Sequence, residues 1–378
     1  MIRIYTLFFL SVLFFACNSN SEHNSEEHSA ENEKSAHNHS SDANAEASTI
    51  IHYEKEANLK DIKQLTFGGD NAEAYFSYDN KHLVFQATNE KWNAPCDQIF
   101  YMPVEGFETD QPPLLSTGKG RTTCSYFMPD GKSIIYASTH RGNEACPEVP
   151  RLMNGKYVWG IFPDFDIFQA DLEGNIIKQL TDSPGYDAEA TISPDGKKIV
   201  FTSTRTGDLE LYVMDIDGSN LIQVTDELGY DGGAFFSPDS KKLIFRASRP
   251  TSDEDVKIYK DLLKQGLVQP TNMELFVCNI DGSDLAQITK LGGANWGPYF
   301  HPSGEKVLFC SNHHSKSGRQ FNIFSINLDG TDVRQITFDE AFDAFPMFSH
   351  DGKKLVFSSN RNNGGTRDTN VFIADWVE

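Results

Sequence analysis

Short runs that alternate apolar and polar residues recur along most of the chain and are separated by turn-forming residues. One unit shows the pattern in full. Its four runs are 188–193 (AEATIS), 199–204 (IVFTST), 211–216 (LYVMDI) and 221–225 (LIQVT). Pro194-Asp195-Gly196 follows the first run and Asp217-Gly218 follows the third, and Asp-Gly between such runs is typical of β-hairpins. The unit is therefore predicted to be four short antiparallel strands.

The turn after the first run recurs six times, at intervals of 44 to 65 residues. The six turns are Ser77-Tyr78-Asp79-Asn80-Lys81, Met128-Pro129-Asp130-Gly131-Lys132, Ser193-Pro194-Asp195-Gly196-Lys197, Ser237-Pro238-Asp239-Ser240-Lys241, His301-Pro302-Ser303-Gly304-Glu305 and Ser349-His350-Asp351-Gly352-Lys353. A fixed turn at this period indicates repeated supersecondary units, as in propellers and solenoids.

The two ends of the repeated region are incomplete in complementary ways. The region opens at 62–66 with a run of the fourth type and closes at 371–376 with a run of the third type. If the first run pairs with the last, it completes the final unit and removes an exposed sheet edge. The sequence therefore predicts an all-β fold over residues 59–378. It is a six-bladed β-propeller with four-stranded antiparallel blades, in which the N-terminal strand closes the last blade.

The amino-acid sequence of the repeat also resembles that of a known protein family. The run 193–205 (SPDGKKIVFTSTR), followed by 211–218 (LYVMDIDG) and Gln223-Val224-Thr225, resembles the WD-type repeat of TolB-like propellers. The similarity extends over residues 59–378. It implies a scaffold of the cell envelope that binds an envelope protein or a peptidoglycan-associated partner. Similar blades occur in the non-catalytic propellers of prolyl oligopeptidases, so an accessory propeller of a peptidase is an alternative.

The N-terminal region is predicted to be a targeting segment followed by a tether. Arg3, a short apolar run at 7–15 and Ala16 before Cys17 predict a signal peptide over residues 1–16. A small residue before cysteine resembles the lipobox of bacterial lipoproteins, which implies that Cys17 is acylated; ordinary cleavage is the alternative. Residues 18–49 contain no Phe, Trp or Tyr, so we expect a disordered tether over 17–58. The protein is then lipid-anchored, periplasm-facing or on the cell surface, and touches the membrane through the anchor only.

The net charge of the chain limits the classes of partner that it is expected to bind. The formal net charge is −21, with 33 Lys and Arg against 54 Asp and Glu. Nucleic-acid binding requires basic surfaces, so it is not expected here. We expect a monomer that has no cofactor.

Propeller topology sorts the loops onto two faces. The tight turns lie on one face, which we call the plain face. The connections from second to third strand, and from blade to blade, lie on the other, which we call the loop-rich face. Its long insertions are 89–98, 139–166, 249–273, 312–322 and 360–370. Binding sites usually lie on such loops. Helical spacing after Ser252 predicts one short helix that crosses the mouth of the ring.

Two classes of polar residue are expected around the mouth of the pore on the loop-rich face, with Trp296 beside them. Acids begin the inner strands, and arginines follow the second strands. They are Asp70, Asp187, Asp231 and Asp343, and Arg141, Arg205, Arg249 and Arg361. The acids either bind a cation or basic ligand or bond within their own loops. The arginines either pair with the acids in a repeated structural bridge or hold a carboxylate or a sugar.

Catalysis is the second hypothesis. The chain has no Gly-x-Ser-x-Gly nucleophile elbow and no His-Glu-x-x-His helix, so an enzyme is not favoured. A carbohydrate-active or hydrolytic site at the pore mouth would need an acid and a base, such as Asp231 or Asp343 with His140. No metal site is expected, because the adjacent His313 and His314 point in different directions.

The chain contains six cysteines, which fall into groups. Cys278 and Cys310 lie in predicted strands and are expected to be buried thiols. Cys96, Cys124 and Cys146 lie in or beside the loops of the first two blades, and two of them can pair in an oxidising envelope. We favour Cys124–Cys146, with Cys96–Cys124 as the alternative.

Overall fold

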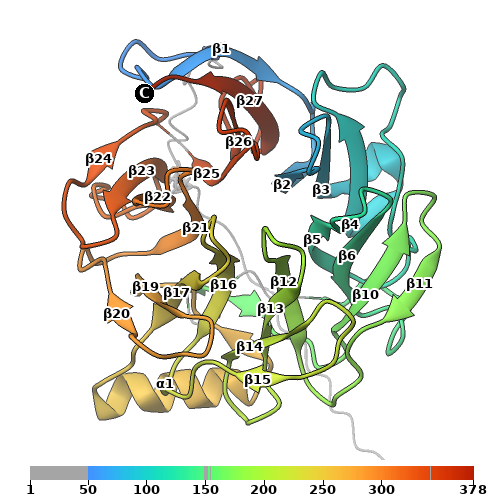
Figure 1. Cartoon of the computed structure of the whole chain (residues 1–378). Helices are drawn as coiled ribbons and strands as arrows, with labels where there is room; N and C mark the ends of the chain where they lie inside the picture. Colours follow the sequence, from blue (N-terminus) through green and yellow to red (C-terminus); the bar gives the residue numbers. More distant parts are fainter. Residues whose placement is uncertain (1–49, 149–151, 154, 341) are drawn as a thin grey trace, which may run out of the picture. The chain divides into compact units, whose positions relative to one another are not determined.

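The computed structural model describes residues 50–148, 152–153, 155–340 and 342–378. The predicted signal peptide, Cys17 and most of the predicted tether lie outside these residues. The described part confirms an all-β propeller of six blades (Figure 1).

The inner strand of each blade lies nearest the centre of the ring and the outer strand lies at the edge (Figure 1). Blade 1 consists of β2 (Asp70–Phe76), β3 (His82–Asn89) and β4 (Ala94–Pro103). Blade 2 consists of β5 (Thr122–Phe127), β6 (Ser133–Ser138), β10 (Asp166–Asp171) and β11 (Ile176–Gln179). Blade 3 consists of β12 (Asp187–Ile192), β13 (Lys198–Ser203), β14 (Glu210–Asp215) and β15 (Ile222–Gln223). Blade 1 has three regular strands, and its fourth position is reduced to one bridge between Phe100 and Leu114.

Blades 4 to 6 each have four strands. Blade 4 consists of β16 (Asp231–Phe236), β17 (Lys242–Ser248), β19 (Met273–Asn279) and β20 (Ala286–Gln287). Blade 5 consists of β21 (Asn295–Phe300), β22 (Lys306–Ser311), β23 (Asn322–Asn327) and β24 (Arg334–Gln335). Blade 6 consists of β25 (Asp343–Phe348), β26 (Lys354–Ser359), β27 (Asn370–Trp376) and β1 (Leu59–Gln64).

The predicted closure of the ring is confirmed. Strand β1 pairs antiparallel with β27, with Leu59 opposite Trp376 and Gln64 opposite Phe372. The first described strand is therefore the outer strand of the last blade (Figure 1). The pairing leaves no unpaired edge on β27, and it joins the two ends of the propeller through a sheet.

A buried ion cluster strengthens this closure. Glu56, just before β1, and Arg361, after β26, both have fully buried side chains. The two guanidinium Nη atoms of Arg361 lie 2.9 and 3.0 Å from the carboxylate oxygens of Glu56, and Nη2 also lies 2.8 Å from Asp343. The backbone N–H groups of Phe338 and Tyr53 donate to the same carboxylate, each at 3.1 Å. A buried charge is tolerated only when it is paired in this way.

The repeated turn is explained by local hydrogen bonds. In blade 3 the Ser193 hydroxyl donates to Asp195 at 2.7 Å and accepts from the backbone N–H of Lys198 at 2.9 Å. The fourth turn residue has positive φ in every blade, which favours Gly or Asn. These residues are Asn80, Gly131, Gly196, Ser240, Gly304 and Gly352.

The Gln-x-Thr pattern of the fourth run has an equally local cause. In blade 3 the Thr225 hydroxyl accepts from the backbone N–H of Leu211 at 2.9 Å, and the Gln223 amide donates to the Thr225 carbonyl at 2.8 Å. A Ser or Thr hydroxyl makes the same bond to the third strand in all six blades. The motif therefore fastens each fourth segment to its blade.

The predicted helix is present but its predicted position is wrong. Helix α1 (Asp253–Leu263) is capped by the Ser252 hydroxyl, yet it lies at the edge of the ring (Figure 1). Its Leu262 packs with Val158 and Leu267. The short strand β9 (Trp159–Gly160) pairs with β18 (Leu267–Val268), so the two long insertions are joined by a two-stranded sheet. The remaining elements are 3-10 helix η1 (Glu90–Trp92), β7 (Leu152–Met153) and β8 (Lys156–Tyr157).

Across the described residues, the search for a helix that is both long and apolar enough to span a bilayer finds none.

We predict that Glu56→Gln lowers the free energy of unfolding by about 3 kcal/mol, because it removes one charge from a buried ion cluster. The matched control is Glu54→Gln, two residues away and exposed, which should change it by less than about 0.5 kcal/mol. Urea unfolding of the full chain followed by circular dichroism measures both. Equal effects of the two substitutions would contradict the role assigned to Glu56.

Candidate functional site

The polar residues at the loop-rich end of each blade occupy matched positions. In blade 3, Asp187 of β12 lies opposite Ser203 of β13, which lies opposite Glu210 of β14. Arg205 follows two residues after Ser203 and folds back over the blade. Its Nε donates to the Ser203 hydroxyl at 2.8 Å, and its Nη2 lies 3.0 and 2.9 Å from the two Asp187 oxygens. The pair is thus held within one blade.

Two other blades repeat this pair. Arg249 Nη1 lies 2.6 Å from Asp231 in blade 4, and Arg361 Nη2 lies 2.8 Å from Asp343 in blade 6. All three aspartates are almost completely buried. The structure therefore brings six of the predicted site residues together as internal pairs, in agreement with the structural-bridge alternative. A role for them in binding an external ligand stays a prediction.

Asp70 and Arg141 do not take part in this arrangement. In blade 1 the position equivalent to Asp187 belongs to Asn71, which lies opposite Ala87, while Asp70 is one residue earlier and exposed. In blade 2 the position of Arg205 belongs to His140, whose Nδ1 lies 2.9 Å from the Ser138 hydroxyl, while Arg141 is exposed. Both predictions of equivalence were wrong by one residue, because the register of the strands does not follow from the turn motif.

Trp296 is buried rather than presented at the mouth. Its indole N–H donates to the Pro270 carbonyl at 3.1 Å, and its ring stacks on Phe321 with centroids 4.4 Å apart. Trp159 of β9 packs on it, with centroids 5.2 Å apart. Trp296 therefore anchors the paired insertions to blade 5 and is a structural residue here.

Every inner strand contains a β-bulge next to the channel, a feature that sequence reasoning missed. One residue of each bulge has positive φ: Glu73, Cys124, Glu189, Gly233, Gly297 and Phe345. Bulges re-aim side chains, and those of Glu73, Cys124 and Glu189 contact residues of a neighbouring blade. The only signal in the sequence is a Glu or Gly three residues before the aromatic end of several inner strands, which is too weak to find them.

A charged pair fills the channel between blades 3 and 4. Glu189 pairs with Arg246 of β17 and accepts hydrogen bonds from Thr202 and Tyr230, each at 2.7 Å. Burial opposes ionisation of Glu189, but Arg246 and these hydrogen bonds outweigh it and lower the pKa of the carboxyl. A Cβ at Gly233 would lie 1.7 Å from the Arg246 guanidinium, so this glycine leaves room for the arginine.

A hydrogen-bonded pair, Glu73 and Cys124, lies between blades 1 and 2. The Cys124 thiol donates to Glu73 at 2.9 Å, and the Tyr75 hydroxyl donates to the same oxygen at 3.1 Å. Burial raises the pKa of Glu73, and the nearby Glu189 charge raises it further. Burial, followed by the Glu73 charge, raises the pKa of Cys124 well above its usual value. Cys124 is therefore a thiol that hydrogen-bonds inside the channel.

Aromatic rings close the channel below these residues. Tyr75 of blade 1 and Phe235 of blade 4, on opposite sides of the ring, have centroids 5.8 Å apart. Tyr126 lies 5.5 Å from Tyr75, and Tyr299 lies 5.2 Å from Phe235. The centre of the ring is thus a packed core at this level.

The residues proposed for catalysis do not converge. Asp231 and Asp343 are each paired with an arginine of their own blade. His140 contacts Ser138 and the ring of Phe168, both of its own blade. Within the described part of the chain, no group of three or more His, Cys, Asp or Glu is arranged to hold a metal ion.

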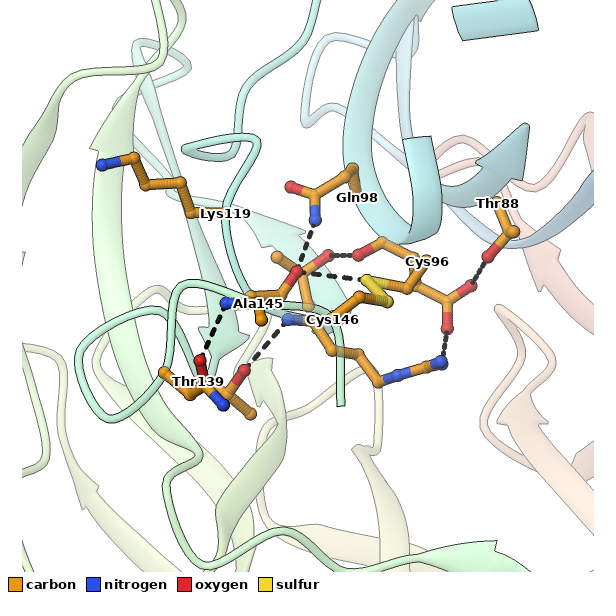
Figure 2. The surroundings of a disulfide bond; sticks show 12 residues. Thr88, Cys96, Gln98, Lys119, Thr139, Ala145 and Cys146 are labelled. Atoms are coloured by element: carbon orange, nitrogen blue, oxygen red, sulfur yellow. Dashed lines mark hydrogen bonds and ion pairs between the residues drawn. A yellow bond between two sulfur atoms is a disulfide. The ribbon is translucent and has the colours of Figure 1, made fainter. Parts of the chain in front are cut away.

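The structure corrects the predicted disulfide. Cys96 of β4 is bonded to Cys146 of the 139–166 insertion (Figure 2), with Cα atoms 6.0 Å apart, whereas Cys124 is a buried free thiol. The bulge turns Cys124 into the channel and away from Cys146. The bond instead ties the insertion of blade 2 to blade 1. Cys278 and Cys310 are buried free thiols, as predicted.

Hydrogen bonds and an ion pair support the insertion beside this disulfide. The Gly120 N–H donates to the Glu144 carbonyl at 2.8 Å, and Lys119 lies 2.7 Å from the Glu144 carboxylate. Gln98, beside the disulfide in Figure 2, donates to the Gly120 carbonyl at 2.8 Å. The first part of the insertion is therefore held against the blades.

A carboxyl pair connects blades 3 and 4. Glu210 accepts a hydrogen bond from Thr225 at 2.6 Å and is buried beside Asp231. Burial raises the pKa of Glu210 to about 8, and the Asp231 charge adds to this effect. Burial also raises the pKa of Asp231, although Arg249 opposes the shift. At neutral pH the pair therefore retains a proton.

We predict that stability falls as the pH rises toward 8. The pKa of Glu210 is about 8 in the folded state, against about 4.3 in an unfolded chain, so the folded state binds more protons between these values. The free energy of unfolding then falls by up to about 1.4 kcal/mol per pH unit from this group. Glu210→Gln should remove this contribution, as measured by urea unfolding at pH 5, 6.5 and 8.

Glu274→Gln is the matched control, because Glu274 has the equivalent place in blade 4. The shared proton requires the pH dependence to change more in Glu210→Gln than in Glu274→Gln. An unchanged slope in Glu210→Gln would rule out the shared proton.

The comparisons with known proteins agree with this architecture. Residues 163–252 and 267–372 match the family model of the TolB beta propeller domain. The structure of a protein described as TolB from Agrobacterium tumefaciens is similar, with a TM-score of 0.53 and 20% identity over 82% of this chain and 91% of that one. The crystal structure of TolB from Acinetobacter baumannii has a TM-score of 0.49 and 19% identity over 82% and 64% of the two chains. At 20% identity, the similarity to the Agrobacterium tumefaciens structure shows a shared fold. The family match extends over more than half of the sequence, and the chain belongs to the TolB beta-propeller family.

Proposed function

We propose that this protein is a lipid-anchored protein of the cell envelope whose propeller binds another protein on its loop-rich face. The observation that carries the proposal is the difference between the two faces of a TolB propeller. The plain face consists of short turns that bond internally, whereas the loop-rich face presents long insertions fixed by a disulfide and by the β9–β18 pairing. Variable loops on a rigid scaffold are the usual place for recognition.

Exposed apolar side chains support this choice of face. Phe67, in the connection from β1 to β2, is 66% exposed. In the 139–166 insertion, Leu152 of β7 lies opposite Tyr157 of β8, and they are 60% and 48% exposed. Large apolar and aromatic residues of this kind supply much of the energy of protein interfaces. A partner that docks on the loop-rich face would bury these side chains.

The anchoring part of the proposal rests on the sequence. A signal peptide over 1–16 with Cys17 as the acylated residue would place the propeller on the outer side of a membrane, at the end of the polar segment 17–58. By likeness to TolB, the partner would be an envelope protein or a peptidoglycan-associated protein. The propeller would act as a monomer that contacts the membrane only through its lipid.

Site-specific photo-crosslinking in intact cells tests both parts. A photoreactive amino acid at Phe67 or Tyr157 should give a crosslinked protein adduct. The same probe at Lys132 or Lys241, exposed on the plain face, should give none. In the same cells, Cys17→Ala should move the protein from the membrane fraction to the soluble fraction, while Asn18→Ala should not.

Adducts of equal yield from both faces would contradict the assignment of the binding face. A Cys17→Ala protein that stays in the membrane fraction would contradict the anchor and leave the binding face to stand on the crosslinks alone.

A further inference from the structure

A depression of about 390 Å³ lies at the loop-rich end of the outer strands of blade 4. We call it the Arg249 pocket. It is lined by Glu227, Leu228, Arg249, Pro250, Thr251, Phe276, Leu285 and Gln287. Its volume falls within the range of small-ligand sites in proteins. Its lining includes neither the channel residues described above nor Phe67 and Tyr157.

Arg249 differs from its two counterparts in one respect. In blades 3 and 6 the Nε of the arginine donates to a serine hydroxyl two residues earlier, that of Ser203 or Ser359. In blade 4 this serine is replaced by Ala247, so Nε has no such partner. Blade 4 is therefore the one of these three blades in which Nε lacks its serine partner.

The hydrogen bonds of Arg249 all go through one nitrogen. Nη1 lies 2.6 Å from Asp231 and 2.9 Å from the Ser248 carbonyl. Neither Nε nor Nη2 has a hydrogen-bond partner among the described residues, and Nη2 is buried without one. These two nitrogens form one edge of the guanidinium, and that edge matches the two oxygens of a carboxylate.

The surroundings of this edge favour an anion with an apolar body. The guanidinium carbon lies 5.0 Å from the centroid of Phe276, which fixes the plane of the group. Leu228 and Pro250 are apolar walls, and Leu285 is 41% exposed. Glu227 is exposed and also lines the pocket, so its charge disfavours a ligand with several negative charges.

We propose that the Arg249 pocket binds a monocarboxylate joined to an apolar group, either the C-terminal residue of a peptide or a free acylated amino acid. The carboxylate bonds to Nε and Nη2 of Arg249, and the apolar group lies against Leu228 and Leu285. The pocket lies on the loop-rich face, but its binding of a carboxylate does not depend on the protein partner proposed above.

Isothermal titration calorimetry of the full chain tests the proposal with three probes: N-acetyl-leucine, acetyl-Ala-Ala-Leu and the C-terminal amide of that peptide. The free acids should bind at least about tenfold more tightly than the amide, because only a carboxylate accepts two charge-assisted hydrogen bonds. Binding of both acids identifies any apolar carboxylate as a ligand, and binding of the peptide acid alone identifies a peptide C-terminus.

Two variants separate the pocket from the stability of the blade. Ala247→Ser supplies the hydroxyl found in blades 3 and 6 and leaves the Arg249–Asp231 pair in place. It should weaken binding of the acids by at least about fivefold by occupying Nε. Leu285→Asp places a like charge on an exposed wall and should abolish binding. Leu221→Asp, at the equivalent and equally exposed position of blade 3 (42%), should not.

The proposal is overturned if neither acid binds, if the amide binds as tightly as the acid, or if Leu285→Asp leaves the affinity unchanged. An Ala247→Ser protein with wild-type thermal stability and wild-type affinity would overturn it as well.

Discussion

The pairing of β1 with β27 is the interaction on which the rest of the structure depends. It completes blade 6 with a strand from the other end of the repeated region and turns a row of sheets into a ring. Arg361 adds a second fastening, because it joins the segment before β1 to blade 6 through Glu56 and Asp343. The closed ring fixes which loops share a face, and with them the surface on which binding is proposed.

Within the ring, charges stabilise the blades instead of lining an open site. Asp–Arg pairs are buried at the ends of blades 3, 4 and 6, and Glu189 with Arg246 occupies the channel. A buried ion pair of this kind adds little to the net free energy of folding, but separating its partners leaves a buried charge unpaired and is costly. The pair therefore favours one arrangement of the blade. We propose that recognition falls to the loops and to Arg249, whose Nη2 is buried without a hydrogen-bond partner.

The sequence predicts features that depend on local bonds, and it fails where the outcome depends on register or tertiary packing. The turns and the Gln-x-Thr motif are local, and they were sufficient to predict six blades and their closure. The predicted equivalence of Asp70 and Arg141 to residues of the other blades was wrong by one residue, because the turn sequences do not determine the register of the strands. The predicted disulfide of Cys124 was wrong because a bulge turns that side chain inward. The predicted position of helix α1 was wrong because packing on Val158 and Leu267 holds the helix at the edge of the ring.

Hydrogen–deuterium exchange across β1 tests the closure of the ring most directly. Amides of β1 that pair with β27 should exchange only through global unfolding, at the same rate as amides of β26 and β27 in the same blade. Exchange of β1 within the first minutes, with β26 and β27 still protected, would show that the first strand is not part of the last blade and would contradict the account.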